Sequence, residues 1–319
     1  MVAGDYRRCR TVILGSLGGD EAVGDTVKKL EYGIADRAWQ VCIGCSPKMP
    51  CSNNCWARKT EARTVECLRV YHPGRAGFYQ RALTPDLKQW SGRVLIDEAH
   101  LNDPLHWRKP VLIATGFHGD IGRVGLTGTS AIFQVIDRCP QHRFVLLTKQ
   151  PDEFLRWAGV LDRNGIGNAT LGCSVMNQAE ADRQRPAMAA LAALGWHTHC
   201  WYEPALGPVD WRGWEFLELL ICGGESGKDS RPMHPQWARN TRDWCQRNGV
   251  AFRMKQHGDW VKIPLASEDE DTDVLLRVDG SRGQLNGEEV TRMRRVGKRA
   301  TGNLLDGREH NGLPDWRRL

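Results

Sequence analysis

Short apolar runs alternate with amphipathic segments along most of the chain. The runs are rich in Val, Ile, Leu and Cys, extend over five to seven residues, and end in polar or glycine-containing turns, as buried strands do. They predict strands at Val111–Gly116, Phe144–Thr148, Ala169–Val175, Thr198–Tyr202, Leu217–Cys222 and Val250–Met254. The residues between them predict helices at Ser130–Arg138, Pro151–Leu161, Gln178–Leu194 and Pro235–Asn248.

Alternation of strands and helices predicts a parallel sheet with helical crossovers. An earlier strand is expected around Trp39–Ile43, followed by a helix from Cys55 to about Glu66. Pro186 is expected to break or start a helix within its segment, because proline lacks the backbone N–H that a helix interior needs. We therefore expect an α/β fold that forms a partial (β/α)6 TIM-like barrel.

The expected barrel covers residues 37–260, between an N-terminal extension of residues 1–36 and a C-terminal extension of residues 261–319. The C-terminal extension contains an acidic segment, Ser267–Asp273, and a basic segment, Thr291–Arg299. The basic segment fits either a surface hairpin with charged edges or a contact with nucleic acid.

Composition excludes several classes of protein. The 319 residues are 41% hydrophobic and 26% charged, which excludes a disordered or collagen-like chain. No apolar run approaches the roughly 18 residues of a membrane helix, and Thr11–Gly15 is too short for a signal peptide. We expect a cytoplasmic protein with no membrane partner. The net charge of +6 lies entirely before Val261 and is compatible with a phosphate-bearing substrate.

The chain contains eleven cysteines, and without a secretion signal they predict reduced thiols rather than a disulfide framework. Four of them, Cys42, Cys45, Cys51 and Cys55, fall within fourteen residues. Their spacing fits a structural zinc site or a [4Fe–4S] cluster equally well. Their position favours the cluster, because the loop follows the expected first strand and catalytic loops lie at the C-terminal ends of barrel strands.

The segments Gly44–Pro47, Cys51 and Cys55–Arg58 resemble the cluster motif of the radical S-adenosylmethionine (radical SAM) superfamily, in a branch common in bacteriophages. Further matching segments follow in the same order along most of the chain: Pro104–Pro110, Leu146–Lys149, Leu171–Gln178, Glu203–Pro208, Gly223–Gly227, Arg231–Met233, Lys255–Gln256, Val296–Lys298 and Leu304–Gly307.

The resemblance implies a [4Fe–4S] cluster held by Cys45, Cys51 and Cys55, with one iron open to S-adenosylmethionine (SAM). The common spacing in the superfamily is C-x3-C-x2-C, whereas these cysteines are spaced C-x5-C-x3-C. Cys42 could therefore replace Cys45 as a ligand. One electron from the cluster would cleave SAM into methionine and a 5′-deoxyadenosyl radical that abstracts a substrate hydrogen.

The resemblance also implies residues that bind SAM at the ends of strands: Gly116, His118, Asp120, Ser174, Asn177, Gln178, Gly223, Gly224 and Glu225. Each group has a simpler interpretation. His118 and Asp120 could form an ordinary polar turn, Asn177 could be a helix N-cap, and the glycines could serve a tight turn.

Four strand-end charges, expected in the same cavity, are candidates for catalytic contact with substrate: Lys149, Glu203, Arg231 and Lys255. A charge in such a cavity needs a partner, so one or two of them are expected to form an ion pair instead. For Lys149 the candidate partners are Glu203, a neighbouring carboxylate, or an anion of the substrate or SAM.

The function expected from the resemblance is modification or isomerisation of a nucleoside or DNA base, as in the hypermodification of phage thymidine. The partners would be a nucleoside or nucleic-acid substrate and an electron donor such as flavodoxin or ferredoxin, in the cytoplasm of the bacterial host if a phage encodes the chain. The alternatives are a radical SAM enzyme for a peptide or small metabolite, and a zinc-stabilised nucleic-acid-binding protein without catalysis.

Overall fold

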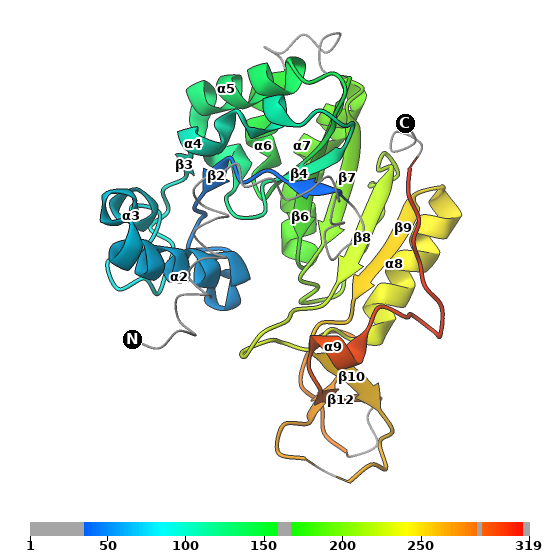
Figure 1. Ribbon diagram of the computed structural model, residues 1–319. Helices are drawn as coiled ribbons and strands as arrows, with labels where there is room; N and C mark the ends of the chain where they lie inside the picture. Colours follow the sequence, from blue (N-terminus) through cyan, green and yellow to red (C-terminus); the bar gives the residue numbers. More distant parts are fainter. Residues whose placement is uncertain (1–34, 159–166, 269, 286–288, 315–319) are drawn as a thin grey trace. The chain divides into compact units, whose positions relative to one another are not determined.

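The computed structural model describes residues 35–158, 167–268, 270–285 and 289–314 (Figure 1). The chain divides into two compact units, Met1–Thr170 and Leu171–Leu319. Nearly all of the expected N-terminal extension lies outside the described residues. No helix in the described ranges is long and apolar enough to cross a bilayer.

The first unit combines short strands with helices. Its strands are β1 (Arg37–Ala38), β2 (Cys42–Ile43), β3 (Leu95–Ile96), β4 (Leu112–Thr115) and β5 (Arg143–Thr148). Its α-helices are α2 (Trp56–Tyr71), α3 (Pro73–Gln80), α4 (Glu98–Leu101), α5 (Gly125–Asp137) and α6 (Pro151–Ala158). Three 3-10 turns lie at Ser52–Asn54, Asp103–His106 and Ile121–Arg123. The helix expected after the cysteine loop is confirmed as α2, which is longer than predicted.

The single strand expected at Trp39–Ile43 is wrong, because two short strands occupy this region. β1 pairs with β4 in parallel, and the pairing ends where Trp39 N donates to Ala114 O at 2.9 Å. β2 turns away and pairs with β3 in a separate antiparallel ribbon. An apolar run of this kind does not reveal which neighbouring strand each half will pair with.

The second unit follows the predicted alternation more closely. Strand β6 (Ala169–Val175) spans the boundary between the units and leads to α7 (Gln178–Ala193). The remaining elements are β7 (His197–Tyr202), β8 (Leu219–Gly223), α8 (Pro235–Asn248), β9 (Ala251–Gln256), β10 (Trp260–Ile263), β11 (Val274–Leu276), β12 (Thr291–Arg295) and α9 (Lys298–Thr301).

Helix α7 corrects the expectation for Pro186, since it runs through this proline without a break. The missing N–H costs one helical hydrogen bond. Packing outweighs that cost here, because Ala181, Gln184, Met188 and Leu191 are all fully buried on the same helix.

The main sheet has seven strands in the order β1-β4-β5-β6-β7-β8-β9, which is also their order along the chain. The pairs β1–β4, β4–β5, β7–β8 and β8–β9 are parallel. This topology confirms a mixed α/β fold with a parallel sheet and helical crossovers, and it is compatible with a partial TIM-like barrel.

The C-terminal extension forms a three-stranded antiparallel sheet in the order β10-β12-β11. Its acidic and basic segments pair with each other. Arg294 lies 2.8 Å from both Asp273 and Glu270, and Arg292 donates to Ser267 O at 2.6 Å. This arrangement supports the interpretation of the basic segment as a hairpin with charged edges.

Candidate functional site

Three cysteines of the loop line one pocket in the first unit. Cys45, Cys51 and Cys55 line a pocket whose lining also includes Asp120 and Lys149. Cys42 is fully buried in β2 and does not belong to the lining. The structure therefore groups the three cysteines that the motif resemblance selects.

Local contacts hold the cysteine loop against the turn after β4. Gly44 and Gly119 form a parallel bridge, and Asp120 N donates to Gly44 O at 2.9 Å. The turn begins at Gly116, whose φ is +92°, and a Cβ atom at this position would lie 2.0 Å from Leu147 O, so there is no room for a side chain. Main-chain contacts thus bring the ends of β4 and β5 to the cysteine pocket.

The thiols of the loop differ in their surroundings. Burial raises the pKa of Cys45 to about 12, and the nearby Lys149 ammonium opposes this rise. Cys55 is the N-cap of α2, and its Sγ accepts a hydrogen bond from Arg58 N at 3.5 Å. A helix N-terminus favours negative charge, so this position suits a thiolate.

Asp120 has an oxygen available to a ligand. Its Oδ1 accepts hydrogen bonds from the Thr148 hydroxyl and, at 3.2 Å, from Lys149 N. Its Oδ2 is buried and has no hydrogen-bond partner within the part of the chain that the structure describes. Because a buried carboxylate oxygen without a partner is costly, this atom is suited to a cationic group bound in the pocket.

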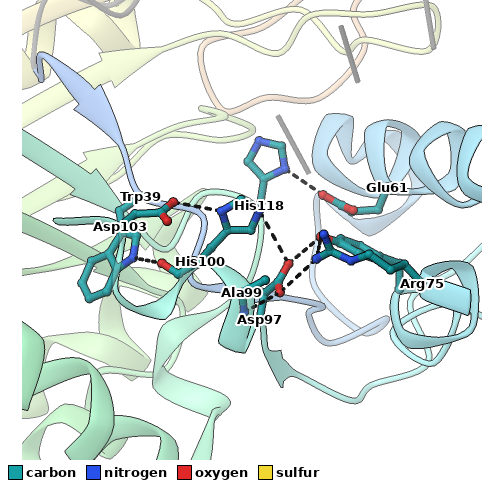
Figure 2. A network of polar contacts seen from close by, with 9 residues as sticks. Trp39, Glu61, Arg75, Asp97, Ala99, His100, Asp103 and His118 are labelled. Atoms are coloured by element: carbon teal, nitrogen blue, oxygen red, sulfur yellow. Dashed lines mark hydrogen bonds and ion pairs between the residues drawn. The ribbon is translucent and has the colours of Figure 1, made fainter. Parts of the chain in front are cut away.

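His118, another lining residue, has polar contacts with Gln40 and Glu61, and Figure 2 shows the contact with Glu61. Gln40 Nε2 lies 3.0 Å from His118 Nε2, and Glu61 Oε1 lies 2.9 Å from Nδ1. With Gln40 as donor, Nε2 is an acceptor and Nδ1–H donates to Glu61. Trp56, which is 50% exposed, contacts the imidazole edge-on at a centroid distance of 4.9 Å.

A second polar network connects α3 and α4 with the segment that precedes β2 and the cysteine loop (Figure 2). Asp97 accepts from the Tyr79 hydroxyl and lies 3.5 Å from Arg75 of α3. His100 contacts Asp103 at 2.9 Å, and its carbonyl accepts from Trp39 Nε1 at 2.8 Å. The network ties α3 and α4 to the segment that leads into β2.

In the second unit, three predicted SAM-binding residues have protein partners. Asn177 is the N-cap of α7 and accepts from Glu180 N at 3.0 Å. Gln178 accepts from Asp210 N at 2.7 Å and donates to Asp182. Ser174 is buried in β6, and its carbonyl accepts from Gln184. The simpler interpretation of Asn177 as an N-cap is confirmed.

The loop after β8 is also occupied by protein contacts. A Cβ atom on Gly224 would lie 2.2 Å from His257 O, so this glycine permits close packing of two backbone segments. Glu225 is buried and accepts from Arg231 Nε at 2.9 Å and from its NH2 group at 2.7 Å. Two predicted site residues are therefore partners of each other. Gly223 packs against the Glu203 side chain.

Glu203 and Lys255 form a half-buried ion pair. Lys255 Nζ lies 2.6 and 2.7 Å from the two Glu203 oxygens and 5.3 Å from the centre of the Trp201 ring. Gln256 donates to Glu203 at 3.3 Å. The expected ion pair among the four strand-end charges is thus formed by these two residues.

We predict that Lys255→Met lowers thermal stability, because it leaves the Glu203 carboxylate without its counter-charge. Breaking a buried pair costs roughly 3 kcal/mol. Thermal unfolding monitored by circular dichroism measures the loss, and the double variant Glu203→Gln with Lys255→Met should recover most of it. An unchanged melting temperature in Lys255→Met would show that the pair contributes little to folding.

Among the described residues, five further cysteines are buried free thiols: Cys139, Cys173, Cys200, Cys222 and Cys245. Cys67 on α2 is the exception, since it is disulfide-bonded. The expectation of reduced thiols is wrong at this position. A disulfide requires two Cβ atoms within about 4.5 Å, and spacing along a chain does not reveal such an approach.

The pocket contains side chains that can act as metal ligands, but they do not form a site for a single metal ion. Among the described residues, no three or more His, Cys, Asp or Glu side chains are placed so that they could hold a metal ion. Each thiolate in an iron–sulfur cluster binds a different iron, so the donors of a cluster surround a cavity instead of meeting at one point. Three cysteines that form no disulfide and line one pocket fit that donor set.

Glu61 is a site residue that sequence reasoning missed. It lies on the buried face of α2 with Ala57, Val65 and Leu68. A carboxylate on the apolar face of an amphipathic helix is the signal that could have found it, because such a group needs a polar partner. Its partner, His118, is 57 residues away in the sequence.

The fold and the site define a mixed α/β protein with a parallel sheet and a cysteine-lined pocket beside the ends of β4 and β5. The chain belongs to the family described as protein of unknown function (DUF5131), whose sequence model matches residues 29–314. Neither a curated protein nor a solved structure matches the chain.

Proposed function

We propose that this protein is a radical SAM enzyme. The observation that carries the proposal is the pocket in which Cys45, Cys51 and Cys55 lie with Asp120, one of whose buried oxygens has no partner. The three thiolates would hold a [4Fe–4S] cluster. Bound there, such a cluster would supply the one-electron chemistry that cleaves SAM into methionine and a 5′-deoxyadenosyl radical.

The residues around the pocket have distinct roles in this proposal. Asp120 Oδ2 would accept a hydrogen bond from the ammonium group of SAM, since this oxygen is buried in the pocket and carries negative charge. Because Gly116 has no side chain, the turn after β4 can approach β5 closely. The main-chain carbonyls of this turn therefore stay near Asp120. His118, oriented by Glu61, would present its imidazole to the bound molecule.

The distribution of charge supports an anionic substrate. Residues 48–93 contain nine Lys and Arg and three Asp and Glu, so this segment has a net charge of +6. The net charge of the whole chain is also +6. This segment contains two of the three cysteines of the pocket and all of α2 and α3. A positive field attracts phosphates, so we propose a nucleoside or nucleic acid as substrate, with isomerisation or modification of a base as the reaction.

Anaerobic purification tests the proposal. A radical SAM enzyme should be brown, bind iron and sulfide after reconstitution, and release 5′-deoxyadenosine from SAM when dithionite is added. A colourless protein that binds zinc in place of iron would contradict the proposal and favour a structural zinc site. Release of 5′-deoxyadenosine without a change in nucleosides or DNA would retain the enzyme class and point to a peptide or metabolite.

A further inference from the structure

We propose that Lys149 is a fixed positive charge that favours the reduced state of a cluster bound by Cys45, Cys51 and Cys55. The inference rests on the proposed function and changes the role expected for Lys149 from substrate contact to control of the cluster. Lys149 lies in the lining of the same pocket as the three thiols.

The position of Lys149 is determined by its backbone. It directly follows β5, whose last five residues are buried, and its N–H donates to Asp120 Oδ1 at 3.2 Å. The preceding residue, Thr148, donates its hydroxyl to the same oxygen. These contacts fix the backbone of Lys149 at the wall of the pocket, where its half-buried side chain begins. The fold therefore places Lys149 in the lining of the pocket that the three cysteines also line.

The electrostatics of the pocket agree with this placement. Burial alone would lower the pKa of Lys149, but the negative charge that Cys45, Cys51, Asp120 and Cys55 can carry outweighs burial and raises it. The same ammonium opposes the rise in the pKa of Cys45. Lys149 is thus a cation whose main electrostatic neighbours are the proposed ligands.

A charge count shows the expected effect on reduction. Three thiolates and Asp120 bring four negative charges, against two positive charges on an oxidised [4Fe–4S] core and one on Lys149. One electron from an external reductant makes this site more negative. Coulomb attraction to Lys149 is stronger in the reduced state, so the lysine raises the reduction potential.

The test is a redox titration of reconstituted protein with dithionite in the absence of SAM, followed by electron paramagnetic resonance. Lys149→Met keeps the length of the side chain and removes the charge. We expect its ratio of reduced to oxidised cluster at a fixed potential to fall about tenfold, which is 59 mV for one electron. Lys149→Arg should stay near wild type. Lys88→Met removes an equal charge from an exposed position outside the pocket and should not shift the potential.

Each other outcome overturns the inference. A wild-type potential in Lys149→Met would show that the lysine does not act on the cluster, and weaker SAM binding in that variant would then assign it to SAM. An equal shift in Lys88→Met would indicate an effect of net charge. If Lys149→Met binds no iron, a lowered potential in Lys149→Arg contradicts the proposal. Wild-type protein that binds no iron and sulfide would overturn the proposed function as well.

Discussion

Replacing Cys45, Cys51 or Cys55 with alanine is expected to reduce bound iron and sulfide to background in each single variant. In the proposed cluster each thiolate would be the protein's only bond to one iron, and the lining of this pocket has no fourth cysteine to replace a lost ligand. The measurement is iron and sulfide content after anaerobic reconstitution, together with the visible absorption of the cluster.

Cys42→Ala is the matched control for these variants. Cys42 lies only three positions before Cys45 and is equally a free buried thiol, but it does not line the pocket. This variant should keep its cluster. If Cys42→Ala loses the cluster while Cys45→Ala retains it, Cys42 is the third ligand. Full cluster content in all four variants would remove the loop from metal binding.

Asp120→Asn is expected to weaken SAM binding by at least about tenfold while the iron content stays the same. A hydrogen bond between charged partners is worth about 1.5–3 kcal/mol, and the amide replaces one acceptor oxygen with a donor. Asparagine keeps the size of the side chain and one oxygen for Thr148 and Lys149. Calorimetric titration of SAM into reconstituted protein measures the change.

Asp86→Asn is the control for loss of a carboxylate in the same unit. Asp86 is exposed, and its contacts with Thr84 and Lys88 lie outside the pocket. SAM affinity should be unchanged in this variant. Equal affinities in Asp120→Asn and wild type would show that the buried Oδ2 has another purpose and would place the ammonium group elsewhere.

The candidate site was only partly visible in the sequence. The resemblance to the radical SAM motif implied Cys45, Cys51, Cys55 and Asp120, and the strand-end charges included Lys149; the structure places all five in the lining of one pocket. The contact between His118 and Glu61 was not predictable, because it joins a turn to a helix 57 residues earlier. An ion pair among the strand-end charges was expected, but that Lys255 would pair with Glu203, 52 residues away, was not predictable. Such contacts depend on how elements pack, which local patterns do not encode.

The sequence by itself determined the local elements. Helix α8 has the predicted bounds because its signals are local, with Pro235 in the first turn and Gly249 at the end in the left-handed conformation, φ 71°. Strand β6 also matches, since a short buried strand is one continuous apolar run. Only the tertiary structure decided the division of Arg37–Ile43 between two sheets and the continuation of α7 through Pro186. In both cases, contacts distant in the sequence contribute more free energy than the local preference that they override.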